Sequence, residues 1–218
     1  MNERKADAGM PSPRFSYLGG DSSIDFVNTV DDRLGEAPVD RLTTYETLLE
    51  WLEGAKLARK RTIASLRDAA AEDPARAERA LRSARRLRRA LYRTFLAAAS
   101  GGSPDDADLR TITTLGRAAA TRTGLRPSGE TFTWTLDEEG TLDLAWPIWK
   151  IAELAVRLLT SDALAHVRQC ADPTCGWLFL DRSRNHSRRW CDMRSCGNRA
   201  KARRNYAQQK AKRAARKR

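Results

Sequence analysis

The sequence predicts a mainly α-helical N-terminal domain with one small β-hairpin, followed by a small zinc finger of the treble-clef type. Three observations support this fold class. Apolar residues recur at helical spacing through most of residues 40–159, and a short stretch from residue 131 alternates with a period of two. All four cysteines lie between Cys170 and Cys196. The apolar fraction of 41% with six tryptophans is enough for a packed core, which excludes a wholly disordered chain.

The predicted N-terminal domain covers residues 14–163, and a polar arm of residues 1–13, which we expect to be mobile, precedes it. Residues 15–30, FSYLGGDSSIDFVNTV, combine an apolar run with a Gly-Gly turn and predict a strand or an extended entry into a first helix. Three polar side chains of this stretch allow two interpretations. They line a pocket for a small-molecule ligand, or they bond the backbone at a helix start or turn, which we favour. These residues are Asp25, Asn28 and Thr29.

Longer helices follow. Residues 40–57 are amphipathic and should end near Gly54, and residues 75–99 form a long helix with Leu, Ala and Phe toward a core. The opposite side of that helix carries a row of arginines that is either solvated or part of a DNA-binding surface: Arg82, Arg86, Arg89 and Arg93. Residues 103–115 open another helix, with Ser103 as its N-cap. Pro147 starts a last helix with a buried stripe to Leu159.

Between these helices the periodicity changes. TFTWTL at residues 131–136 and TLDLAW at residues 141–146 both alternate, and DEEG joins them with a glycine at its end. Two alternating runs joined by such a turn predict a β-hairpin between residues 131–136 and 141–146.

The cysteines are spaced Cys170-x4-Cys175-x15-Cys191-x4-Cys196. Two pairs separated by a medium loop suit one tetrahedral, structural Zn²⁺ bound by four thiolates. Gly176 directly follows the second cysteine, where a tight metal-binding turn requires positive φ. The alternatives are Cys–His catalysis with one of the two histidines, His186 in place of one cysteine, and a disulfide framework. The paired spacing favours zinc over all three.

The second cysteine pair constrains the geometry. Residues five apart on an α-helix point about 140° away from each other, so Cys191 and Cys196 cannot bind one ion from within one helix. We therefore expect Cys191 in a turn and Cys196 at the first turn of the helix that follows. The segment WLFLD before them is strand-like, which completes a finger over residues 164–210.

The positive charge is concentrated at the C-terminus. From Arg182 onward there are 15 Lys and Arg and one acid, a net charge of +14, whereas the preceding 181 residues carry 25 basic and 27 acidic residues, a net charge of −2. This distribution is typical of a polyanion-binding segment, here ending in a basic tail over residues 211–218. The predicted nucleic-acid contacts are Arg182, Arg184, Arg188, Arg189, Asn198, Arg199, Lys201, Arg203 and Arg204.

The stretch from CGWLFLD to the sequence CGNR at Cys196–Arg199 resembles the CGNR zinc-finger family. SSIDFVNTVDDR and LLEWL resemble the alanine-rich ABATE domain that typically precedes this finger. The resemblance implies a transcription regulator linked to stress responses, with the finger as its DNA reader. An N-terminal domain that senses a ligand or binds a partner would fit this arrangement.

We therefore predict a zinc-dependent DNA-binding regulator, with double-stranded DNA as its partner and a small-molecule ligand or a homodimer as further partners. An RNA-binding protein and a protein-interaction module with an acidic partner remain alternatives. No signal peptide or long apolar run is evident, so we expect a cytoplasmic protein that is not bound to a membrane. No nucleophile–base pair, paired carboxylates or phosphate-cradling loop is evident either, so we do not expect an enzyme.

Overall fold

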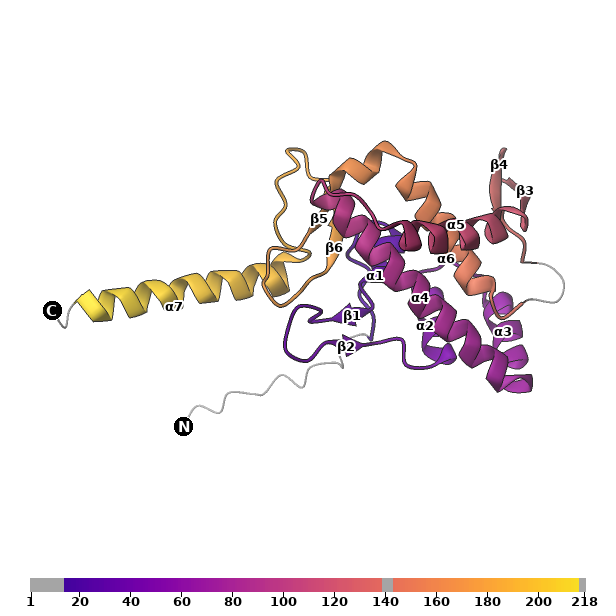
Figure 1. The fold of residues 1–218 in the computed structure, drawn as a ribbon, viewed down its shortest axis with the longest axis horizontal. Helices are drawn as coiled ribbons and strands as arrows, with labels where there is room; N and C mark the ends of the chain where they lie inside the picture. The colour runs from indigo at the N-terminus through magenta and orange to yellow at the C-terminus, as the bar shows by residue number, and fades with distance from the viewer. Residues whose placement is uncertain (1–13, 139–142, 216–218) are drawn as a thin grey trace.

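The computed structural model of the protein describes residues 14–138 and 143–215. A helical body forms one end of the molecule, and a long helix projects away from it at the other end (Figure 1). The arm predicted at residues 1–13 lies outside the described residues, as do the last three residues of the predicted basic tail. None of the described helices combines the length and the apolar composition that crossing a bilayer requires.

Within the described residues, six α-helices build the body. Their bounds are α1 Ser22–Val27, α2 Tyr45–Gly54, α3 Lys60–Glu72, α4 Pro74–Ala99, α5 Asp106–Ala120 and α6 Trp146–Leu159. The predictions of a helix that ends at Gly54, of the long helix and of the helix opened by Pro147 are confirmed. Helix α5 begins two residues later than predicted, because the side chain of Asp105, and not Ser103, accepts the hydrogen bond from Ala107 that caps it. Helix α3 was not predicted from the sequence.

Helix α4 lies at the centre of the body and contacts α1, α2, α3, α5 and α6. The apolar residues predicted to face the core are all fully buried: Leu81, Ala84, Leu87, Leu91 and Phe95. The predicted row of arginines lies on the exposed side. Two of its members form ion pairs within the protein, Arg82 with Glu78 and Arg93 with Asp108.

The predicted strand at residues 131–136 is present and forms a β-hairpin, but its partner strand is not the predicted one. Strand β4, Thr131–Leu136, pairs antiparallel with β3, Thr123–Ser128, which precedes it. Gly129 has a φ of +62° and is the first residue of the two-residue loop, which is where a type II′ hairpin turn requires glycine. Residues 139–142 of the expected second strand lie outside the described residues, and Trp146 already begins α6.

Two further strand pairs connect the body to the C-terminal segment. Strands β1 (Val30–Asp31) and β2 (Val39–Asp40) form one antiparallel pair, and β5 (Val167–Gln169) and β6 (Leu178–Leu180) form the other. A 3₁₀ helix, η1 (Asp162–His166), precedes β5 and contains the predicted domain boundary. Val167, Leu178 and Leu180 belong to the same apolar core as the six helices, so β5 and β6 pack against the body.

The chain ends in η2 (Met193–Gly197), a single π-helical turn, and α7 (Asn198–Ala215). Asp192 caps η2 through a hydrogen bond that its side chain accepts from the backbone N–H of Ser195. Helix α7 has 18 residues, which corresponds to a length of about 27 Å. Beyond its first turn it extends away from the body, as Figure 1 shows.

Candidate metal centre

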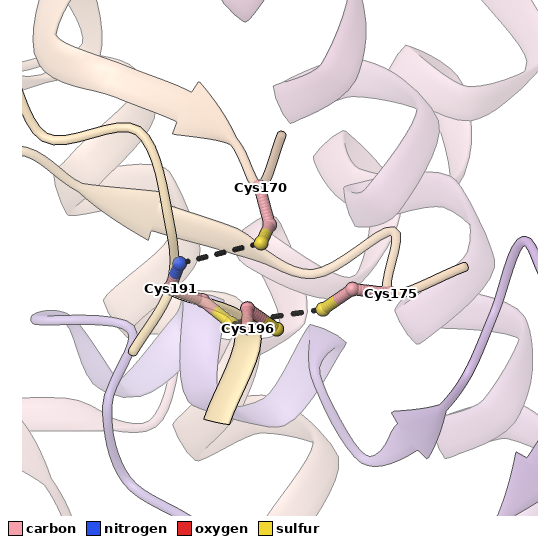
Figure 2. A group of neighbouring side chains, drawn as sticks. All are labelled: Cys170, Cys175, Cys191 and Cys196. Atoms are coloured by element: carbon pink, nitrogen blue, oxygen red, sulfur yellow. Dashed lines mark hydrogen bonds between the residues drawn. The ribbon is translucent and has the colours of Figure 1, made fainter. Parts of the chain in front are cut away.

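The four cysteines converge at one point from two parts of the chain, the loop between β5 and β6 and the region of η2. Cys170 directly follows β5, Cys175 precedes β6, Cys191 lies in the turn before η2, and Cys196 lies within η2 (Figure 2). All four side chains are buried, and their sulfur atoms lie within 4.8 Å of one another. The strand pair with its knuckle, followed by a helical segment that carries the last ligand, is the predicted treble-clef-like arrangement.

The sulfur positions fit a zinc ion. Tetrahedral coordination with Zn–S bonds of about 2.3 Å places neighbouring sulfurs about 3.8 Å apart. The Sγ atom of Cys191 lies 3.6 Å from that of Cys175 and 3.5 Å from that of Cys196, too far for disulfides. All four cysteines are free thiols. The cluster is therefore a site for one structural zinc ion, as predicted.

The four thiols affect one another's ionisation. Hydrogen bonds from Cys175 and Cys191 lower the pKa of the Cys170 thiol. Hydrogen bonding to Cys170 raises the pKa of Cys175 and Cys191, and burial raises that of Cys196. Four thiolates so close together repel one another unless a cation lies between them. A zinc ion would supply that charge and hold all four deprotonated.

One detail of the predicted ligand geometry is wrong. Cys196 was expected in the first turn of an α-helix, but it lies in the π-helical turn η2, and α7 begins two residues later. The wider π turn directs Cys196 toward Cys191 before the α-helix starts. The expectation for Gly176 is confirmed, because its φ is +69° and a Cβ atom there would lie 2.9 Å from Leu34 Cγ.

Neither histidine joins the metal group within the described residues. The rings of His166 and His186 instead stack on each other, with centroids 3.9 Å apart and an angle of 5° between their planes. Trp177 and Trp190 pack against the cysteines.

A buried carboxylate links α7 to the zinc knuckle, the loop between β5 and β6 that carries Cys170 and Cys175. The Asp172 side chain, fully shielded from solvent, accepts hydrogen bonds from Arg199 Nε at 3.0 Å and Arg203 Nη2 at 3.1 Å. Burial alone would raise the pKa of Asp172, but hydrogen bonds from Arg199, Thr174 and Arg203 outweigh it and hold the pKa below its usual range. Arg199 also donates to Cys196 Sγ at 3.1 Å. The two arginines therefore fix the first turns of α7 against the metal site.

Comparison with known families agrees with this architecture. The family model described as "ABATE: Putative stress-induced transcription regulator" matches residues 20–162, about two thirds of the chain. The chain belongs to the ABATE family. The model of the CGNR zinc finger matches residues 166–209, so the ABATE domain is followed by a CGNR finger, as the sequence resemblance predicted. A search of curated proteins found no match.

Hydrogen bonds join the ABATE domain to the backbone of the CGNR finger. They come from the side chain of Asn28 and from backbone N–H groups. Asn28, at the end of α1, donates from Nδ2 to the carbonyl of Leu178 at 2.8 Å and accepts from its N–H at 2.9 Å. Its carboxamide therefore bonds β6 as a neighbouring strand would. The N–H groups of Arg33 and Leu34 also donate to carbonyls of the knuckle, at Cys175 and Thr174. The finger is thus built onto the ABATE domain.

The polar residues of the DFVNT motif are all bonded within the protein. Asp25 accepts a hydrogen bond from the N–H of Gly19, and Thr29 donates to the carbonyl of Phe26 and accepts from Arg88. Burial raises the pKa of Asp25 to about 6. These contacts support the interpretation of Asp25, Asn28 and Thr29 as structural residues.

The predicted nucleic-acid contacts divide into two groups. Four have partners within the finger. Arg199 and Arg203 bind Asp172, Asn198 donates to the carbonyl of Arg194, and Arg188 donates to the carbonyls of Trp190 and Cys191. The other five have exposed side chains without an ion pair among the described residues: Arg182, Arg184, Arg189, Lys201 and Arg204. Nothing in the sequence signals that Asp172 anchors α7 or that Asn28 bonds β6, because each side chain acts on a partner distant in sequence.

Proposed function

We propose that this ABATE-family protein is a zinc-dependent DNA-binding protein that regulates transcription, with α7 as the element that contacts the duplex. The observation that carries the proposal is the exposure and charge of α7. Every side chain from residue 201 to residue 213 is exposed, and no acidic residue follows Asp192. Five cations on α7 form no ion pair among the described residues: Lys201, Arg204, Lys210, Lys212 and Arg213. Such a helix gains little stability from contacts with the rest of the protein, and phosphates would neutralise the repulsion among its cations.

The anchoring of α7 defines which of its faces is most available. Arg199 and Arg203 lie on one side of the helix and bind Asp172. At 100° per residue, Lys201, Arg204 and Lys212 fall on the opposite side, within about 80° of one another. A helix of about 27 Å with cations along one face has the dimensions to lie in a major groove. The zinc site would hold the base of this helix rigid, so the ion is structural in this function.

The loop between β6 and the third ligand offers a second cationic surface. Arg182, Arg184 and Arg189 are exposed there, and Asp181 orders the loop by accepting hydrogen bonds from Ser183 and Arg188. We include these three arginines among the proposed phosphate contacts. The corresponding roles of Arg199 and Arg203 are to position α7, with their remaining exposed surface available to phosphate.

The ABATE domain is proposed to control the finger. A cleft of about 470 Å³ lies between the two, lined by Asp32 and Val39 on one side and by Trp177, Arg199 and three of the zinc ligands on the other, so it includes the edge of the metal site. A small molecule bound there would contact the ABATE domain and the base of α7 together. A cytoplasmic location fits the four free thiols, which persist in reducing compartments.

Binding of the zinc-loaded protein to a random duplex pool tests the proposal, with selected sequences then measured by fluorescence anisotropy. Replacing Lys201 and Arg204 by alanine should weaken duplex binding by about tenfold to a hundredfold without loss of zinc. The matched control removes the same charge from the other side of α7 at Lys210 and Arg213, and should have the smaller effect.

The result also separates the rival functions. If both double variants lose duplex affinity equally, the interaction is non-specific charge attraction. That result would contradict the assignment of the face with Lys201 and Arg204 to the duplex. Tighter binding to single-stranded RNA than to duplex DNA, lost in Tyr206→Ala, would favour the RNA alternative, because Tyr206 is the exposed aromatic of α7. Absence of duplex binding alongside binding to an acidic protein would favour the interaction module.

A further inference from the structure

The β3–β4 hairpin carries an apolar face whose outer part lies outside the core. Leu125 pairs with Trp134 and Pro127 pairs with Phe132 across the hairpin, so the four side chains share one face. Leu136 lies on the same face at the base of the hairpin and is buried in the core. Beyond it the face is uncovered, with exposed fractions of 64% for Leu125, 70% for Phe132 and 54% for Trp134.

The opposite face of the hairpin is polar and contacts α6 at its base. It carries Arg126, Thr133 and Thr135, and Lys150 of α6 donates a hydrogen bond to Thr135 Oγ1 at 3.1 Å. The apolar face therefore enters the core only at Leu136, and its outer part is left in solvent. Two exposed aromatic side chains on one small face indicate a contact surface.

The backbone of β4 has free hydrogen-bonding groups at the same residues. In the described part of the chain β4 pairs only with β3. The N–H of Asp137 donates to the carbonyl of Arg122, which fixes the phase of the ladder. Because bonded pairs alternate along antiparallel strands, the N–H and C=O groups of Phe132 and Trp134 point away from β3. Strand β4 also contains no charge, proline or glycine that would blunt this edge.

We propose that the β4 edge is a homodimer interface, in which β4 of one copy pairs antiparallel with β4 of a second copy. A two-fold axis at Thr133 places Phe132 of each copy opposite Trp134 of the other. Both residues then exchange their outward N–H and C=O bonds, and each phenyl ring lies beside an indole on the shared face. Strand β3 suits this role less well, because Pro127 has no N–H to donate at its outer edge.

The available area and the charge distribution both fit a second copy. The four exposed apolar side chains offer roughly 400 Å² per copy, about half of what a standard interface buries per partner, and the strand edge adds to it. The hairpin lies at the end of the molecule opposite α7 (Figure 1). Two copies joined there keep their basic helices apart, so the net charge of +12 on each opposes association less. The proposal does not depend on DNA binding.

Sedimentation of zinc-loaded protein free of nucleic acid, over a wide concentration range, tests the proposal. The native chain should reach twice its mass of 24.5 kDa. Replacing both Phe132 and Trp134 by threonine, which suits strands, should raise the dimer dissociation constant by at least about a hundredfold. Leu109→Thr on α5 is the control, since it removes an exposed leucine outside the hairpin and should leave the dimer intact.

Amide exchange followed by NMR tests the predicted pairing directly. The N–H groups of Phe132 and Trp134 should be protected at high protein concentration and exchange rapidly after dilution, whereas Thr133 and Thr135 should be protected at both. A monomer at all concentrations would overturn the proposal. So would a dimer that persists in the folded Phe132→Thr, Trp134→Thr variant, or amides of Phe132 and Trp134 whose exchange is independent of concentration.

Discussion

The junction between the ABATE domain and the CGNR finger depends on Asn28, so we expect Asn28→Ala to be strongly destabilising. Asn28 is buried, and both polar atoms of its carboxamide bond the backbone of Leu178. Alanine removes both partners at once. The N–H and C=O of Leu178, in the buried β6 strand, would then lose their partners in a region that water does not reach.

The magnitude follows from the two groups left without partners. A buried donor or acceptor without a partner costs about 1–3 kcal/mol, so the free energy of unfolding should fall by about 2–6 kcal/mol. Asn28→Asp should cost a similar amount, because a carboxylate accepts from the N–H but cannot donate to the carbonyl. For a marginally stable protein this is a large fraction of the total.

Urea unfolding of the zinc-loaded protein, followed by circular dichroism, measures the effect. Asn198→Ala is the matched control: its amide bonds a carbonyl on the exposed surface of η2, and its loss should change stability by less than about 0.5 kcal/mol. A loss of under about 1 kcal/mol in Asn28→Ala would refute the argument that this side chain completes β6.

Three further predictions concern the metal, the buried acid of α1 and the anchor of α7. Chelation of zinc should lower the melting temperature of the whole chain and not only unfold a separate finger, because Leu178 lies in the common core; calorimetry showing an unchanged main transition would contradict this. Asp25→Asn should raise stability by about 3 kcal/mol above pH 7 and by about half of that near pH 5. The sign follows because the pKa of Asp25 in the folded state, about 6, is raised above the unfolded value of 3.8. This carboxyl therefore stabilises the fold at low pH and loses that contribution as pH rises through 6. Equal gains in stability at both pH values in urea titrations would contradict the prediction. Asp172→Asn should speed amide exchange at the start of α7 and weaken DNA binding about tenfold with zinc content unchanged, because Arg199 and Arg203 lose their shared anion; unchanged exchange there would exclude the anchoring role.

The metal site could be predicted from the sequence because its chemistry is local. Four cysteines in paired spacing have few other uses in a reducing compartment, and Gly176 marks the turn that the knuckle requires. The long helix was predictable for a similar reason, since its apolar stripe repeats over many turns. Helix α3 was missed because it is largely polar and its N-cap, Arg59, makes no side-chain cap hydrogen bond.

The pairings between distant segments could not be predicted. The strand at residues 131–136 was paired with the wrong partner, because the sequence offers a turn with a glycine on both sides of it. Only the backbone shows that the turn at Gly129 is the hairpin loop. Asn28 bonds Leu178, which is 150 positions away, and Asp172 binds Arg203, 31 positions away. From composition, the arginines near the metal were predicted to bind a polyanion. In the structure two of them, Arg199 and Arg203, bind Asp172 and hold α7.

The salt dependence of duplex binding by the zinc-loaded protein tests the central claim most directly. Five α7 cations without ion-pair partners predict that the logarithm of the binding constant falls with the logarithm of salt concentration with a slope of about −3 to −5. The slope should become less negative by about 2 when Lys201 and Arg204 are replaced by alanine. A binding constant that barely changes with salt, or a slope that these two substitutions leave unaltered, would contradict the account of α7 as a zinc-anchored phosphate-binding helix.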